Sequence, residues 1–516
     1  MDSPEFIVVG LDGGSWSFLD PWLNSGILPN LTEIRDNHHA GPLESCLPPV
    51  TSPNWKCYST GRSPGQLGVY WWETLDWANE TIATPSSGDY KGAELWDYLS
   101  EDGLESLVVN MPTTYPPPSI KGRLVSGGPT AGESSYTSPD SLEEELRQSY
   151  NYRTLPESID FIQSDPERAI QEIRELMKLR FEVAEDQFEK QPSDFLQVTL
   201  YLINVLQHHF GHQDPVREAW QWIDRKIGEW RNEFPDTPLV LLSDHGCNEI
   251  HSQFNINQWL IQEEYLSAGS TVDQTVLSSI GLNKDRLARF LASVGLKKPL
   301  KSVLPKTIRN WLPTEDDSVM GPGKNRLIDW GATKAYAFGQ GPVFVKPSLP
   351  EPDLSSVKTS LLEKLQTLSD PSGHPVASSI FTGSAYYGDH TEGTKPDLII
   401  DQADNIHISN SIGFDQIFQQ PDQWEAENEK MGLYAWVDPS GETILSDKDD
   451  TVQITDIMPS ILAHMTGKIP EGIDGNVRFS KPNSEPPETI EPISEPSTQD
   501  AEEESTREKL EGLGYL

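Results

Sequence analysis

The chain has 516 residues and a formal net charge of −41, from 80 acidic against 39 basic residues. This charge disfavours binding to nucleic acid and to anionic membranes, and it fits a halophilic protein that works in high salt, where screening weakens self-repulsion. The sequence shows no secretory signal and no transmembrane run of about 18 apolar residues, so we expect a cytoplasmic protein.

Four short apolar runs rich in β-branched residues indicate buried strands, at residues 6–11, 107–110, 195–202 and 239–242. Helical patterns such as residues 166–191 separate them. Strands that alternate with helices favour an α/β fold with a large, mainly parallel central sheet flanked by helices. Strand-like pieces resume after residue 330, so we assign residues 1–252 and 331–480 to one α/β core.

Three segments lie outside this core. Residues 253–330 have a helical pattern and predict an inserted cap, in which residues 284–309 concentrate Lys and Arg. This basic stretch favours weak contact with an anionic substrate or membrane surface, although an amphipathic helix with a solvated basic face explains it more simply. Residues 481–506 are rich in Pro, Glu and Ser, which predicts a disordered acidic linker, and residues 507–516 predict a C-terminal docking segment.

Side chains that suit a metal ion follow two of the predicted strands. Asp12 follows the first strand, and Asp244 and His245 follow the strand at residues 239–242. Because the carboxyl ends of parallel strands share one edge of a sheet, we expect these side chains to meet. A carboxylate and an imidazole together can bind one divalent cation.

Thr51 is the candidate nucleophile. It precedes Pro53, which suits the first turn of a helix. The free N–H groups and the positive end of the helix dipole at such a position attract a phosphoryl oxygen, although a simple helix N-cap is an alternative role. A cation held nearby would lower the pKa of the Thr51 hydroxyl and make it a usable nucleophile.

Short motifs are spread over nearly the whole chain, namely GLDG at 10–13, VTSP at 50–53, TGRSPG at 60–65, SDHG at 243–246 and TDIMPSIL at 455–462. Together they resemble the motifs of the alkaline phosphatase superfamily, most closely its type I phosphodiesterase and nucleotide pyrophosphatase branch. The resemblance implies an alkaline phosphatase-like fold. It also implies a site with two divalent ions, zinc or sometimes manganese, about 4 Å apart.

The resemblance assigns ligands to both ions. Those of the first ion are all present, namely Asp12, Thr51, Asp244 and His245. The second ion would take an Asp, a His four residues later and a late His before a glycine, but at these positions the chain has Asn204, His208 and Asn428. Because an amide offers only a neutral carbonyl oxygen, we expect one ion rather than two, with His208 as the ligand of a weak second site.

Other side chains near the motifs have two interpretations each. A second site would be rescued if other histidines joined it, the candidates being His209, His212, His390 and His407. Lys56 would either compensate for a missing ion or lie on the surface, and we favour the surface. The aromatic residues Trp55, Trp71 and Trp72 fit either a pocket for a base or sugar or an ordinary core.

The sequence therefore predicts a metal-dependent hydrolase or transferase of phosphate esters, of the phosphodiester or nucleotide type, acting on a small phosphorylated substrate. Thr51 would form a covalent phospho-threonine intermediate, and His208 would bind a weak second ion or protonate the leaving oxygen. Two alternatives stay open. The first is a catalytically degenerate member that binds a phosphorylated ligand, and the second is a sulfate or phosphonate ester hydrolase.

Overall fold

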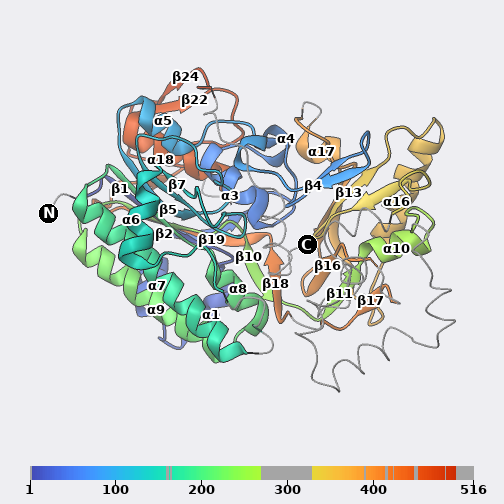
Figure 1. Cartoon of the computed structure of the whole chain (residues 1–516), viewed down its shortest axis with the longest axis horizontal. Coiled ribbons are helices and arrows are strands. Elements are labelled where there is room, and N and C mark those ends of the chain that lie inside the picture. The colour runs from blue at the N-terminus through green and yellow to red at the C-terminus, as the bar shows by residue number, and fades with distance from the viewer. Residues whose placement is uncertain are drawn as a thin grey trace.

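The computed structural model describes residues 3–157, 162, 165–268, 328–388, 391–412, 416–421, 424–446, 451–482 and 484–494. Figure 1 shows a larger α/β body beside a smaller lobe of short sheets and helices. Within the described ranges, no helix is both long and apolar enough to cross a membrane.

A nine-stranded sheet organises the larger body in the described part of the chain, with the order β21-β2-β19-β9-β1-β8-β5-β6-β7. Its strands are β1 (Phe6–Leu11), β2 (His39–Glu44), β5 (Ser106–Met111), β6 (Gly122–Ser126), β7 (Thr137–Ser138), β8 (Phe195–Leu200), β9 (Leu239–Leu242), β19 (Met431–Val437) and β21 (Val452–Gln453). The central strands β9, β1, β8, β5 and β6 are parallel, while β7 and β19 pair antiparallel on the two sides. The predicted α/β class with a mainly parallel sheet is confirmed.

Helices cover both faces of this sheet, which explains why β1 is an unbroken apolar run with every residue buried. Ile7 and Val9 pack into one core cluster, and Phe6 and Val8 pack into another on the opposite face. The first face is covered by α1 (Trp16–Asn24), α2 (Pro29–Asn37), α6 (Ser141–Tyr150), α7 (Pro166–Lys190), α8 (Leu202–Phe210) and α9 (Asp214–Glu233). The second face is covered by α3 (Thr51–Thr60), α5 (Leu95–Glu101) and α18 (Ile457–Thr466).

The smaller lobe contains two short sheets. One has the order β12 (Ala335–Ala337), β13 (Pro342–Val345), β15 (Leu398–Gln402) and β14 (Ala377–Thr382), and the other has the order β16 (Ile406–Ser409), β11 (Ser252–Asn255) and β17 (Phe418–Gln419). The lobe also holds α10 (Ile256–Gln262), α16 (Asp353–Thr367) and α17 (Gly383–Tyr387). The predicted cap at 253–330 thus begins inside this lobe. Its residues 269–327, with the basic stretch 284–309, lie outside the described residues, so the cap stays a prediction.

The remaining elements form strand pairs and short turns. The pairs are β3 (Thr74–Asp76) with β4 (Thr81–Ala83), β10 (Gly246–Glu249) with β18 (Ala426–Glu429), β20 (Ile444–Leu445) with β23 (Phe479–Ser480), and β22 (Lys468–Pro470) with β24 (Glu488–Ile490). The short helices are α4 (Pro64–Leu67), η1 (Ser87–Asp89) and η3 (Ile454–Asp456). Strand β24 lies inside the linker predicted as disordered at 481–506. That prediction is wrong for residues 488–490, because β22 offers them an open edge with which they pair in parallel.

The structure also tests where the predicted elements end. The predicted strands at 6–11, 107–110, 195–202 and 239–242 correspond to β1, β5, β8 and β9, and the predicted helix at 166–191 corresponds to α7. β8 ends at Leu200, two residues early, because α8 follows at once and its own apolar residues prolong the run. The predicted docking segment at 507–516 lies outside the described residues.

Candidate metal centre

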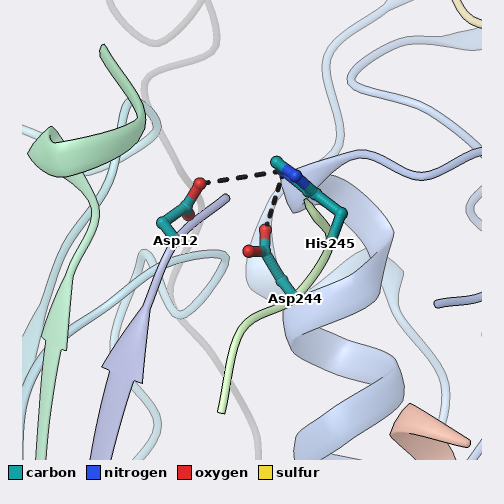
Figure 2. Close-up of side chains that lie close together, drawn as sticks. All are labelled: Asp12, Asp244 and His245. Atoms are coloured by element: carbon teal, nitrogen blue, oxygen red, sulfur yellow. Dashed lines mark ion pairs between the residues drawn. The ribbon is translucent and has the colours of Figure 1, made fainter. Parts of the chain in front are cut away.

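The candidate metal centre lies at the carboxyl edge of the central sheet. β1 and β9 are adjacent and parallel, with Gly10 opposite Leu242. Asp12 leaves β1 beside the point where Asp244 and His245 leave β9, and Figure 2 shows the three side chains facing one another. We call these three residues the acidic cluster. The sheet topology therefore brings the three side chains together, as the sequence predicted.

The acidic cluster and the Thr51 hydroxyl are closely packed. His245 Nε2 lies 3.1 Å from Asp244 Oδ2 and 3.7 Å from Asp12 Oδ1. Thr51 Oγ1 lies 3.4 Å from Asp12 Oδ1 and 3.3 Å from His245 Nε2. All four residues are 0% exposed, and one ligand atom from each of the three cluster residues lies within 4.8 Å of the other two.

The electrostatics of the acidic cluster favour a cation. Burial raises the pKa of both Asp12 and Asp244, and the charge of Asp244 raises the pKa of Asp12 further. His245 Nδ1 hydrogen-bonds to the Gly246 carbonyl at 2.9 Å, so its Nε2 presents a lone pair. Asp244 Oδ2 is buried without a hydrogen-bond partner in the described part of the chain. These lone pairs converge with no proton between them, so the residues fit one divalent ion.

Two neutral donors hold the carboxylates in place. The Trp55 indole Nε1 donates to Asp12 Oδ2 at 2.8 Å, and the Gly13 backbone N–H donates to Asp244 Oδ1 at 3.2 Å. Trp55 lies on α3, one turn after Thr51, so the helix that carries the hydroxyl also orients its acidic neighbour. Sequence analysis predicted only a pocket or a core role for Trp55. Its spacing of four from Thr51 in a helix was the available signal for this role.

The Thr51 hydroxyl faces the acidic cluster and does not cap its helix. Val50 occupies the N-cap position of α3, and no side chain makes a capping hydrogen bond there. Ser52 has φ −106° and ψ 114°, outside the helical region, and its hydroxyl lies 2.6 Å from the Tyr90 hydroxyl. This bend separates Thr51 from the regular part of α3. The simple N-cap role is therefore wrong.

The three residues predicted at the second-ion positions form a neighbouring group, which we call the amide cluster: Asn204, His208 and Asn428. Asn204 Nδ2 lies 3.1 Å from His208 Nε2 and 3.4 Å from Asn428 Oδ1. Asn204 and His208 lie one turn apart on α8, and Asn428 comes from β18. All three are buried. The structure thus brings the predicted second-ion residues together. Their side chains are hydrogen-bonded to one another rather than arranged around an ion.

His208 is held as a neutral imidazole. Burial lowers its pKa to about 4. Its Nδ1 donates to the Ala426 carbonyl at 2.8 Å, and its ring stacks on Trp424 with centroids 4.1 Å apart. The ring proton thus lies on Nδ1, away from Asn204 and the acidic cluster. This state favours a role as ligand or hydrogen-bond acceptor over the predicted role as the acid that protonates the leaving oxygen.

The histidines considered for a rescued second site have other contacts. His407 pairs with Glu427, and His212 pairs with Glu249 at 3.1 Å and stacks on Phe18. His209 packs edge-on to Trp424, and His390 lies outside the described residues. Among the residues that the structure describes, the acidic cluster is the group of three or more His, Cys, Asp or Glu side chains arranged to hold a metal.

Lys56 is not a surface lysine, and that interpretation of the sequence is wrong. It is 3% exposed, with Nζ 2.9 Å from Glu94 Oε2 and 5.5 Å from the centre of the Tyr90 ring. Glu94 lies at the start of α5, so this buried pair joins α3 to α5. Beside it, burial and the charge of Glu94 raise the pKa of Asp97 to about 7. The Lys56 charge is thus matched by Glu94 and does not compensate for a missing ion.

Comparisons with known proteins agree with this architecture. The family model described as type I phosphodiesterase / nucleotide pyrophosphatase matches residues 6–306. Similar solved structures include phosphonoacetate hydrolase from Sinorhizobium meliloti 1021 in complex with phosphonoformate and with phosphonoacetate, each with 11% identity, a TM-score of 0.54, and coverage of 88% of this chain and 94% of that chain. At this identity the similarity shows a shared fold. A comparison with curated proteins gives no match.

Proposed function

The chain belongs to the type I phosphodiesterase / nucleotide pyrophosphatase family, and on that premise we propose that it is a metal-dependent hydrolase of a small phosphorylated substrate, of the phosphodiester or nucleotide type. One observation carries this proposal. A buried hydroxyl, Thr51 Oγ1, lies 3.3 Å from His245 Nε2 and 3.4 Å from Asp12 Oδ1, beside two carboxylates that no cationic side chain of the cluster balances.

The acidic cluster would hold one divalent ion, zinc or manganese, through Asp12, Asp244 and His245, with Thr51 beside it. A bound ion of this kind lowers the pKa of a neighbouring hydroxyl and stabilises charge on a phosphoryl oxygen. Two carboxylates neutralise one divalent cation, which makes a single ion the charge-balanced state of the buried cluster. The metal identity and the count of one are part of the proposal.

The reaction would proceed in two displacements at phosphorus. Thr51 Oγ1 bonds to phosphorus as the bond to the leaving oxygen breaks; the hydroxyl proton passes to solvent, and the leaving oxygen takes a proton from solvent. Water then attacks the phosphorus of the phospho-threonine, whose second ester group is still attached, so a phosphate monoester leaves and the Thr51 hydroxyl is restored. Trp55 fixes Asp12 during both steps through its hydrogen bond of 2.8 Å. The same displacements onto an acceptor alcohol would make the protein a transferase.

A second candidate function is a non-catalytic member that binds a phosphorylated ligand. The amide cluster favours it, because Asn204 and Asn428 stand where the resemblance implies charged or imidazole ligands. The two candidates differ in metal content and in dependence on the Thr51 hydroxyl. A sulfate or phosphonate ester would present a tetrahedral anion of similar size to the same site, and the sulfate ester is tested together with the two candidates.

The test combines elemental analysis of the purified chain with turnover in high potassium chloride. The substrates are bis(4-nitrophenyl) phosphate, 4-nitrophenyl phosphate and 4-nitrophenyl sulfate, and the variants are Thr51→Ala, Thr51→Ser and the control Thr367→Ala, an exposed threonine on α16. We expect about one ion per chain, fastest turnover of the diester, and a loss of about 10³-fold or more in Thr51→Ala. Thr51→Ser should keep measurable activity, and Thr367→Ala should match the parent.

The possible results separate the candidates. Less than about a tenth of an ion per chain together with no turnover would support the binding protein instead. Unchanged turnover in Thr51→Ala would refute the nucleophile. Faster turnover of the sulfate ester would show that sulfate esters are the substrate class, and it would leave the proposed metal centre unaffected.

A further inference from the structure

We propose that the amide pair Asn204–Asn428 takes the place of a second divalent cation, so that a neutral N–H donor of Asn204 holds the lone pair of His208 and Asn428 offers one free donor to the substrate. This inference rests on the proposed single-ion hydrolase. It concerns the part of the site where the family resemblance implies a second ion and where the side chains of this chain do not fit one.

The orientation of the Asn204 amide is set by its neighbours. Gln207 Nε2 donates to the Gly13 carbonyl at 2.9 Å and to Asn204 Oδ1 at 3.5 Å. Trp220 Nε1 in turn donates to Gln207 Oε1 at 3.0 Å, which fixes the orientation of the Gln207 amide. With its carbonyl oxygen committed to Gln207, Asn204 must present its N–H groups on the opposite side.

On that opposite side the Asn204 amide contacts His208, the imidazole that would be a ligand of a second cation. Its Nδ2 lies 3.1 Å from His208 Nε2, the ring nitrogen that carries the lone pair because Nδ1 donates to the Ala426 carbonyl. The Asn204 side chain also lowers the pKa of the Asp12 carboxyl. An N–H group and a cation compete for the same lone pair, so the amide satisfies the His208 lone pair without adding a positive charge.

Charge balance agrees with this arrangement. One divalent ion matches the two carboxylates of the acidic cluster, Asp12 and Asp244. A second ion would leave two buried positive charges to be matched by the substrate, in a pocket where Asn204 and Asn428 contribute none. With asparagine at both positions, the site lacks the charged ligand of a second ion, and it also lacks the negative charge that a second ion would balance.

Asn428 supplies the free donor. β18 pairs with β10, which places Asn428 opposite Cys247, two residues after His245. Its Oδ1 accepts from Asn204 at 3.4 Å and its backbone carbonyl accepts from Gln402 at 2.7 Å. Its Nδ2 is buried and has no hydrogen-bond partner among the residues that the structure describes. An unmet donor beside a phosphoryl site is a natural partner for a phosphoryl oxygen.

The decisive experiment counts ions without measuring activity. The metal-free chain is titrated with Mn²⁺ and followed by electron paramagnetic resonance, with elemental analysis after gel filtration. The proteins are the parent, Asn204→Asp, Asn428→His, the double variant N204D/N428H, and the control Asn232→Asp, which adds the same carboxylate at an exposed position of α9. We expect one bound ion in the parent and the control, and two spin-coupled ions in the double variant.

Each outcome has a distinct meaning. Two ions in the parent would overturn the amide inference and leave the hydrolase proposal standing, whereas no ion in the parent would overturn the hydrolase proposal itself. One ion in a folded double variant would also overturn the inference. These parent measurements decide the matter even when the double variant does not fold.

The free donor has its own test with orthovanadate as the probe. Asn428→Ala should keep one ion per chain and weaken orthovanadate binding about tenfold, the usual effect of removing one hydrogen bond to a charged group. The Asn232→Ala variant serves as the matched control. Unchanged orthovanadate affinity in Asn428→Ala would show that this N–H group does not contact the anion.

Discussion

The acidic cluster and the amide cluster lie side by side at the edge of one sheet, and burial affects them differently. Asp12, Asp244 and His245 direct lone pairs at one another, and the Asp244 Oδ2 atom stays without a hydrogen bond in the described part of the chain. Asn204, His208 and Asn428 donate and accept among themselves. The first group is suited to a cation from solution, whereas the hydrogen bonds of the second are nearly complete without one.

The Lys56–Glu94 pair is a third case, because there the chain supplies the counter-charge itself. Its atoms are 2.9 Å apart and both side chains are almost fully buried. Buried charges thus occur in this core in two states: Lys56 is neutralised by a protein carboxylate, whereas the carboxylates of the acidic cluster have no cationic partner within the cluster. A buried charge that the protein does not neutralise indicates a ligand position more specifically than the presence of acidic residues alone.

The strongest way to break the comparison is Asp244→Asn, which makes the acidic cluster resemble the amide cluster. We expect turnover to fall by about 10³-fold or more, since a metal ligand is lost. The metal-free protein should gain about 1 kcal/mol, because the new Nδ2 can donate to His245 Nε2 while Oδ1 still accepts from Gly13. Kinetics and urea unfolding after chelator treatment measure both effects, and a loss of metal-free stability would contradict the argument.

Glu94→Gln tests the buried charge that the protein neutralises itself, in the Lys56–Glu94 pair. Removing one partner leaves Lys56 buried without its counter-charge, so the free energy of unfolding should fall by about 3 kcal/mol. The double variant Lys56→Met/Glu94→Gln is the control and should recover much of this loss. If Glu94→Gln unfolds at the parental denaturant concentration, the pair does not compensate charge as described.

The two clusters should also respond oppositely to pH in the metal-free protein. Burial raises the folded-state pKa of Asp12 and Asp244, so the stability that these groups contribute is lost as pH rises through their folded pKa. Burial lowers the folded-state pKa of His208 to about 4. Below the ordinary pKa of histidine the unfolded state therefore binds more protons than the folded state, and stability is lost as pH falls. Between pH 7 and pH 5 the His208 effect should be about 2 kcal/mol.

This pH effect is isolated by comparing variants. Unfolding of chelator-treated parent and His208→Asn protein at several pH values should give a shallower acid-side decline for the variant. Asp244→Asn should instead reduce the loss of stability that accompanies a rise in pH above the ordinary pKa of a carboxyl group. Parallel curves for the parent and both variants would show that neither cluster titrates in the expected direction.

Trp55→Phe is the smallest of the expected effects. It removes one neutral donor from Asp12 Oδ2 and keeps the aromatic ring, so turnover should fall about tenfold with the ion count unchanged. Steady-state kinetics and elemental analysis check this prediction. The matched control is Trp22→Phe on α1, whose ring belongs to the core away from the acidic cluster.

The sequence was most informative where a strand ends in a functional residue. Asp12, Asp244 and His245 follow short apolar runs, and sheet topology makes such positions converge. It was least informative where a contact depends on long-range packing. Lys56 looks like a solvated lysine until α5 brings Glu94 against it, and the Asn204 amide is oriented by Gln207 and Trp220 through side-chain contacts that no local pattern contains.

The smaller lobe is tied to the catalytic edge through strand β18. Gln340 donates to Glu427, and Gln402 donates to the Asn428 carbonyl at 2.7 Å, so two residues of the lobe grip adjacent positions of this strand. β18 pairs with β10, which begins immediately after His245. A substitution at Gln340 or Gln402 would therefore disturb the same strand pair that follows the imidazole, so the smaller lobe is part of the frame that supports the metal centre.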